Sequence, residues 1–163
     1  LRKALPIIMD RIDSVNKEKQ IIFAAAIRNI DPDSSNKEKE LLLDAFNTND
    51  ENICSLAIRQ MKNDKEILPD DKLAEYLNQE SSMIRDAALS VAESRASTSL
   101  LPHIIQCLSD PRCAIPARSA LQAYDDNVVV ELLIKHVQRK NVEKSLIIGV
   151  IRTIKNYPTK KKC

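Results

Sequence analysis

A short apolar pattern recurs five times along this chain at an almost constant interval, and it constrains the fold more than any other feature. In each copy a small or apolar anchor residue is followed at once by a larger apolar residue. Successive anchors are 31, 31, 32 and 30 residues apart, at Ala26, Ala57, Ala88, Ala120 and Val150. Apolar residues four positions before or after the anchors line one face of a helix. A period of this length predicts an array of similar helical units.

Each period has room for two helices. The anchors mark the second helix of each pair, and separate apolar runs mark the first, at residues 5–12, 41–46, 73–77, 100–108 and 128–137. Residues 31–36 and the pairs at 49–50, 81–82 and 110–111 supply Asp, Asn and Ser side chains that cap helix starts. Pro116 interrupts the fourth stripe, and we expect it in the first turn of its helix, where its missing N–H costs little.

Glycine is almost absent, with one residue among 163. This argues against hairpins and excludes the glycine-dependent motifs of phosphate-binding loops, dinucleotide folds and nucleophile elbows. No apolar run approaches the roughly 20 residues that cross a bilayer, and no signal-peptide pattern is present. The chain opens close to a helix start, so we expect a piece of a longer protein or a processed one.

The third second-helix segment, SMIRDAAL at residues 82–89, is similar to the Val/Ile-Arg-x-Ala-Ala core of HEAT-like repeats. The fourth, around Arg118, is a looser match, and the other three keep the stripe without the arginine. The resemblance implies an all-α, right-handed α-solenoid of about five antiparallel helix pairs, with the second helices on the concave side and no shared catalytic residues. The repeats then span residues 1–31, 32–62, 63–95, 96–125 and 126–157, followed by a basic disordered tail at 158–163.

Helical geometry at 100° per residue places the positions one before and two after each anchor away from the stripe. The first set, Ala25, Leu56, Ala87, Ser119 and Gly149, predicts a floor of mostly small residues. The second set predicts the partner-binding residues, Arg28, Arg59, Ser90, Gln122 and Arg152. Arginine clamps carboxylates or phosphates. The alternative is that these arginines solvate an exposed face beside nearby acids. Where the family arginine falls, at or beside Arg85 and Arg118, the resemblance implies bonds to the neighbouring repeat.

Charge is unevenly placed. Residues 1–133 hold 16 Lys and Arg against 22 Asp and Glu, whereas residues 134–163 hold nine basic residues and one acid, Glu143. This basic end suggests an alternative partner, a nucleic acid or other polyanion, although Tyr157 is its one aromatic residue. We also expect self-association through the terminal apolar stripes at residues 5–12 and 146–154, because array ends need polar caps.

The four cysteines include no CxxC pair. Cys54 and Cys107 occupy apolar helical positions, which is typical of reduced core thiols in a cytoplasmic protein. His103, Cys107 and Cys113 are three soft ligands, but no fourth is evident, so we favour a structure without a metal.

Catalysis by a HEAT-like DNA glycosylase needs concave-face aromatics that this chain lacks. We therefore expect a non-enzymatic scaffold or regulatory protein-interaction module, without cofactor, that binds a protein or peptide on its concave face. The alternative is nucleic-acid or polyanion binding through the arginine positions and the basic end.

Overall fold

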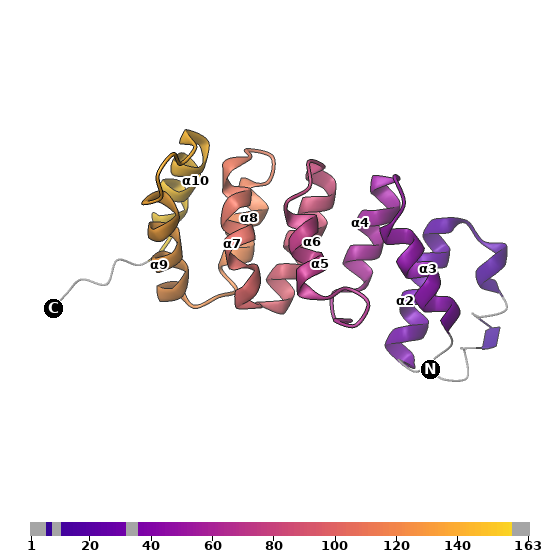
Figure 1. Ribbon diagram of the computed structural model, residues 1–163. Coiled ribbons are helices and arrows are strands. Elements are labelled where there is room, and N and C mark those ends of the chain that lie inside the picture. Colours follow the sequence, from indigo (N-terminus) through magenta and orange to yellow (C-terminus); the bar gives the residue numbers. More distant parts are fainter. Residues whose placement is uncertain (1–5, 8–10, 32–35, 158–163) are drawn as a thin grey trace. The chain divides into compact units, whose positions relative to one another are not determined.

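The computed structural model describes residues 6–7, 11–31 and 36–157, and the described part is all-α. Half of the predicted first helix at 5–12 and the whole tail at 158–163 therefore lie outside the described residues. The chain divides into two compact units, residues 1–69 and 70–163 (Figure 1). No helix in the described ranges is long and apolar enough to cross a membrane.

In the described residues 12–31 and 36–69, the first unit contains three α-helices and a short 3₁₀ helix that packs on the first of them. Its elements are η2 (Ile12–Ser14), α2 (Lys17–Ile30), α3 (Asn36–Phe46) and α4 (Glu51–Gln60). All three α-helices contact one another. Their buried side chains, such as Ile21, Leu42 and Ile58, form the core of this unit. The anchors Ala26 and Ala57 fall within α2 and α4, as predicted.

The second unit, described up to residue 157, contains three successive helix pairs. Its elements are α5 (Asp70–Leu77), α6 (Ser82–Arg95), η3 (Thr98–Leu100), α7 (Leu101–Gln106), η4 (Cys107–Ser109), α8 (Ala114–Leu121), α9 (Asp126–Val137) and α10 (Lys144–Ile154). The first helices contact in the order α5, α7, α9, and α6 contacts α8. Figure 1 shows the three pairs side by side within this unit. Buried side chains of this unit include Tyr76, Leu89, Ile104 and Leu121.

Two of the predicted helix starts are confirmed by side-chain hydrogen bonds. Asp50 accepts from the N–H groups of residues 52 and 53 at 2.9 and 3.3 Å, and Ser81 accepts from residue 84 at 3.4 Å. Pro116 lies in the first turn of α8, as expected. Asp110 differs, because its carboxylate does not cap α8; it accepts instead from the Arg112 N–H at 2.9 Å. Asn16 and Asp125 cap α2 and α9, which the sequence reading missed.

The predicted floor of outward-facing small residues is wrong at three of its five positions. Ala25, Ala87 and Gly149 are buried. A Cβ on Gly149 would overlap the carbonyl oxygen of Leu108 in η4, so this glycine allows α10 to approach η4 closely. At Gly149, therefore, the small residue marks a point where a neighbouring segment comes close. Leu56 is half-buried and Ser119 is exposed.

Candidate partner-binding surface

The first of the predicted partner-binding arginines, Arg28, is not exposed. Arg28 is 7% exposed. Its Nε donates to Asp64 at 2.9 Å, and its Nη2 lies 3.6 Å from a Glu66 carboxylate oxygen. Both acids belong to the loop that follows α4. Arg28 therefore ties α2 to that loop within the first unit, and its prediction as a solvent-facing partner contact is wrong.

The carboxylate that receives Arg28 is itself held by its loop. Burial alone would raise the pKa of Asp64, but the backbone N–H of Ile67, the Arg28 guanidinium and the backbone N–H of Glu66 together lower it. The N–H groups of residues 66 and 67 both lie 3.1 Å from Asp64 Oδ1. Because Asp64 is charged and held in position by its own loop, its ion pair gives Arg28 a structural role.

The other four predicted contacts are exposed. Arg59 lies on α4 in the first unit. In the second unit, Ser90 lies on α6, Gln122 directly follows α8, and Arg152 lies on α10. Gln122 lines a small pocket with Arg118 and Tyr157. The binding role of these four residues stays a prediction, and the residues are divided between the two units.

The resemblance-based role of Arg85 is confirmed. Its side chain, which is 12% exposed, forms an ion pair with Asp110 in the turn between η4 and α8, so it joins one helix pair to the next. The Arg112 side chain, the Arg112 N–H and Arg85 together hold the pKa of Asp110 well below its usual range. Arg95 makes a similar buried pair, at 3.1 Å, with Asp70 at the start of α5. Arg118, by contrast, makes no ion pair in the part described and lines the pocket beside Gln122.

The three described cysteines are core residues. Cys54 and Cys107 are buried, as predicted, and the Cys107 Sγ donates to the Leu77 carbonyl at 3.3 Å. Burial raises the pKa of Cys107 to about 12 and also raises the pKa of Cys113, so neither thiol is activated as a nucleophile. His103 instead pairs with the Asn78 amide at 2.9 Å. Within the described ranges, no three His, Cys, Asp or Glu side chains are grouped as a metal site.

Helix α10 presents the most distinctive surface of the second unit. Its buried face is Leu146, Gly149, Val150 and Thr153. The opposite positions share one face at i, i+3 and i+4 spacing, and all are exposed. We call them the α10 surface: Lys144, Ile148, Ile151, Arg152 and Lys155. From a rise of about 1.5 Å per residue, this surface is about 16 Å long.

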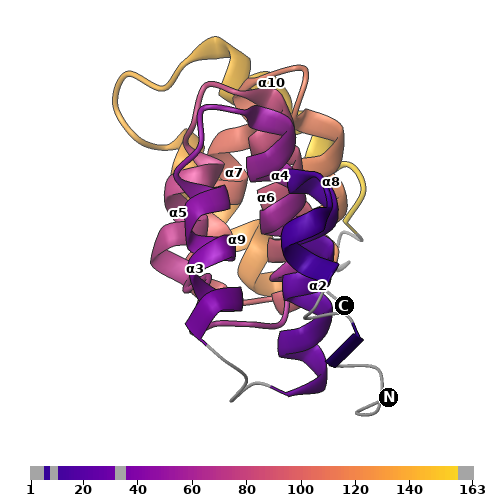
Figure 2. The same ribbon diagram turned by 90° about the vertical axis from the view of Figure 1, so that its right-hand side faces the viewer.

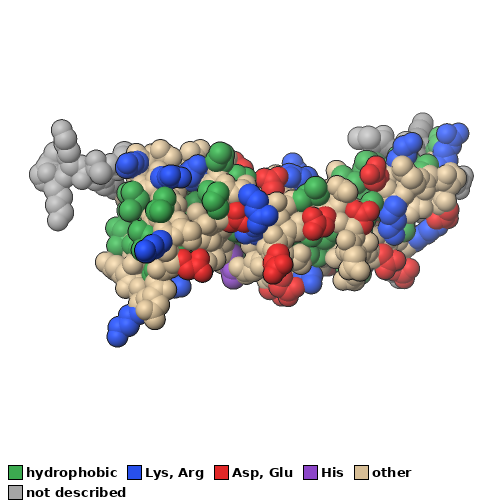
Figure 3. Space-filling model, turned by 90° about the horizontal axis from the view of Figure 1, so that it is seen from above, with side chains coloured by type: hydrophobic (Ala, Val, Ile, Leu, Met, Phe, Trp, Pro, Cys, Tyr) green, Lys and Arg blue, Asp and Glu red, His purple; other side chains and the backbone are tan. Residues whose placement is uncertain are grey.

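The α10 surface combines exposed apolar area with positive charge. Ile148 is 50% exposed and Ile151 is 52% exposed. Its three cations make no ion pair within the part of the chain that the structure describes. Figure 3 shows hydrophobic and basic side chains gathered together over the α9–α10 region. The predicted exposed stripe at 146–154 is therefore partly wrong, because Leu146 and Val150 are buried and the other face is the exposed one.

Comparison with known proteins gives no independent assignment of this surface. No family model matches the chain, and no curated protein and no solved structure matches it either. Chemically, the α10 surface offers apolar contact at its centre and charge-assisted hydrogen bonding at both ends.

Proposed function

We propose that the chain is a non-enzymatic scaffold of HEAT-like helix pairs, arranged as a right-handed α-solenoid, whose α10 surface binds an acidic amphipathic segment of a partner protein. The observation that carries this proposal is the pair of half-exposed isoleucines flanked by three cations that make no ion pair with the described residues. The near-constant repeat period and the successive contacts of helix pairs in the second unit support the solenoid.

The apolar centre of the surface favours a protein segment with its own apolar side. Full burial of an isoleucine side chain contributes about 1.5–3 kcal/mol relative to exposure, so covering the exposed half of Ile148 or Ile151 contributes roughly half of that. An amphipathic helix laid along α10 would cover both, because residues three and four apart share its face. A freely dissolved polyanion would leave this apolar area uncovered.

The positive charges of the α10 surface favour a partner segment of negative charge. Lys144, Arg152 and Lys155 lie on one helix face, and the described part of the basic end, from residue 134, carries a single acid. Acidic residues flanking the apolar positions of a partner would pair with these cations, whereas a basic partner would be repelled. Because the cations are exposed, binding should weaken as salt increases.

Nucleic-acid or polyanion binding is the second candidate, favoured by the basic side chains of residues 134–157. The α10 surface has isoleucines at its centre and no aromatic residue on which a base would stack. This composition fits a peptide better than a nucleic acid.

The test uses a fluorescein-labelled helical peptide of about 18 residues, long enough for stable helix turns, with leucines at i, i+3, i+4 and i+7 and glutamates beside them. Anisotropy would be measured with the parent protein, with the double variant Ile148→Ser and Ile151→Ser, and with the triple variant Lys144→Gln, Arg152→Gln and Lys155→Gln. Each set of changes should weaken binding by about tenfold or more. Two matched controls remove exposed groups elsewhere in the unit, Ile115→Ser and Lys135→Gln, and should change affinity less than about twofold.

Three outcomes would contradict the proposal. The parent protein does not bind the acidic peptide, or it binds a charge-reversed lysine peptide equally well. Alternatively, a single-stranded oligonucleotide binds more tightly than the peptide and its binding survives loss of both isoleucines. The last result would assign the basic end to polyanions. Melting curves of all variants exclude loss of folding as the cause.

A further inference from the structure

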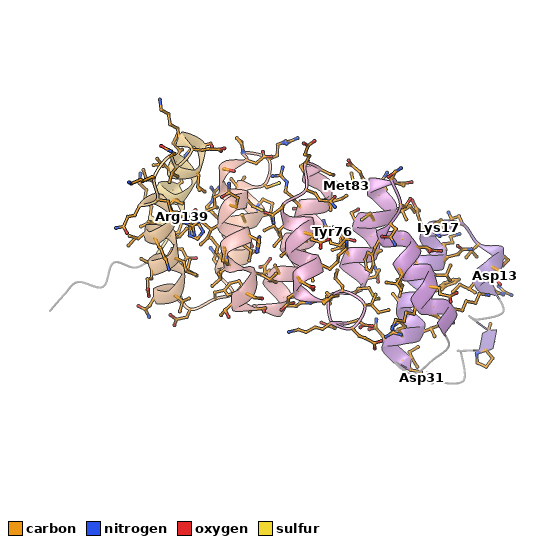
Figure 4. The ribbon with its side chains drawn as sticks, viewed as in Figure 1. Asp13, Lys17, Asp31, Tyr76, Met83 and Arg139 are labelled. Carbon is orange, nitrogen blue, oxygen red and sulfur yellow. The ribbon has the colours of Figure 1, made fainter. Side chains whose placement is uncertain are left out.

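A second feature of the α9–α10 pair is a polar pocket at the start of α10. It is lined by Gln106, His136, Arg139, Lys140, residues 141–143 and Leu146, and it has a volume of about 180 Å³. At about 30 Å³ per water molecule, it has room for a small anion with several waters. Figure 2 shows the loop between α9 and α10 projecting from the helices that it joins, and Figure 4 labels Arg139 in this region.

His136 is the buried polar group of this pocket. It is 4% exposed, and its Nδ1 lies 2.8 Å from the Leu132 carbonyl oxygen. A carbonyl can only accept, so Nδ1 carries a hydrogen and donates it. His136 is one of the residues that line the pocket, and its Nε2 makes no hydrogen bond with the described residues. With Nδ1 held by the carbonyl, Nε2 is the ring nitrogen that is left for a ligand of the pocket.

The remaining groups of the pocket favour an anion. Arg139 and Lys140 are exposed cations that make no ion pair in the described part of the chain. Helix α10 begins here, and its N-cap Glu143 accepts no backbone N–H of the first turn, although its carboxylate accepts from the Ser145 hydroxyl at 3.3 Å. The orphan N–H groups of that turn and the positive end of the helix dipole add to the field. Glu143 is the one opposing charge.

We propose that this pocket binds the phosphate group of a monoester or of free phosphate. A phosphate monoester carries close to two negative charges and three acceptor oxygens, which Arg139, Lys140, the Gln106 amide and the α10 N–H groups can meet. The hydrogen bond at Nε2 needs one proton. Either the imidazolium supplies it, or a monoanionic phosphate donates its own O–H to the neutral ring. This site does not depend on the partner proposed for the α10 surface.

Binding would be read out at His136 itself. The side-chain ¹⁵N resonances of the full chain would be followed while inorganic phosphate replaces chloride at constant ionic strength. We expect the Nε2 resonance of His136 to shift in a saturable way, and that of the half-buried His103 on α7 to stay in place. Absence of a His136 shift up to about 20 mM phosphate would exclude a Kd of about 1 mM or tighter and would overturn the site.

Variants that remove a positive or a negative charge distinguish binding in this pocket from general electrostatic attraction. Arg139→Gln should weaken phosphate binding by about tenfold, and Glu143→Gln should tighten it by about threefold or more, because it removes the one opposing charge. Lys135→Gln removes an exposed cation of α9 outside the pocket and should change affinity less than about twofold. Equal weakening by Arg139→Gln and Lys135→Gln, or no gain from Glu143→Gln, would show nonspecific attraction and overturn the proposal.

A phosphoserine peptide with neutral flanks, its serine counterpart and inorganic phosphate distinguish the source of the group. If the phosphopeptide binds more tightly than inorganic phosphate, a phosphorylated chain is the ligand. If the two bind equally, the site recognises the phosphate group alone. If the serine peptide binds as well as the phosphopeptide, the pocket does not recognise phosphate. The first two outcomes support the site and the third contradicts it.

Discussion

Arg28 and Arg152 occupy the same place in the repeat, two residues after an anchor, yet the structure treats them differently. Arg28 on α2 is buried and paired with Asp64. Arg152 on α10 is exposed and makes no ion pair in the described part of the chain. The difference lies in the loop after α4, which places Asp64 and Glu66 beside Arg28. No described acid is placed in that way beside Arg152.

The comparison extends to the second unit. Arg85 and Arg95 are nearly buried and meet Asp110 and Asp70, whereas the cations of the α9–α10 pair face solvent. A repeat position therefore does not by itself decide what its arginine does. An acid from another segment makes the arginine structural, and the lack of one leaves it available to a partner.

The largest expected effect comes from taking the acid away from a buried arginine. Asp110→Ala leaves the Arg85 guanidinium without its carboxylate at a site only 12% exposed. We expect a loss of about 2–4 kcal/mol in the free energy of unfolding, because an uncompensated buried charge is costly. Urea unfolding measures this loss, and Glu131→Ala, an exposed acid on α9, serves as the control at about 0.5 kcal/mol or less. Equal effects of the two changes would show that the Arg85 pair is not structural.

The second-largest expected effect on stability concerns the packing of α10 on η4, which leaves Arg152 on the exposed face of α10. Gly149→Ala places a methyl group against the Leu108 carbonyl, and overpacking of this kind costs about 1–3 kcal/mol. In an unobstructed helix the same change stabilises by about 0.5–1 kcal/mol. The sign of the change in urea midpoint therefore reports whether α10 packs on η4 in this register. Stabilisation would contradict the assignment of the α10 faces.

Acid should affect the paired region more than the exposed one. The folded state lowers the pKa of Asp64 and Asp110, so it binds fewer protons there than the unfolded chain does. Their contribution is complete above the ordinary carboxyl pKa of about 4 and is lost as pH falls below it, by about 1–2 kcal/mol in total. Unfolding measured from about pH 6 to pH 3 should show this loss, and the Asp110→Ala variant should show less of it.

The smallest effect comes from supplying an acid to Arg152 on its own helix. Ile148→Glu places a carboxylate four residues before Arg152, the favourable orientation for an exposed helical pair. We expect a stabilisation of only about 0.3–0.5 kcal/mol, together with loss of acidic-peptide binding. A gain comparable to the loss in Asp110→Ala would show that exposure does not separate the two classes of arginine. Thermal melts and anisotropy measure the two quantities.

The sequence predicted the helices better than their faces. Each of the five anchors falls within a helix, and Asp50 and Ser81 located two helix starts, because these are local signals. The burial of Ala25, Ala87 and Gly149 could not be read from one helix alone, since it depends on neighbouring segments such as η4. Pairing of Arg28 depends on a loop 36 residues away. The pocket at His136 was also not predicted. The sequence showed that this end of the chain is basic, but it did not show how the loop between α9 and α10 closes the pocket.

The central claim is that the paired arginines hold the fold while the α10 cations bind a partner. Its most direct test measures urea unfolding and acidic-peptide binding on the same two variants, Arg28→Gln and Arg152→Gln. We predict that Arg28→Gln loses about 2–3 kcal/mol of stability. We predict that Arg152→Gln changes stability by less than about 0.5 kcal/mol and weakens peptide binding severalfold. The opposite pattern, a stable Arg28→Gln and an unstable Arg152→Gln that still binds the peptide, would contradict the account.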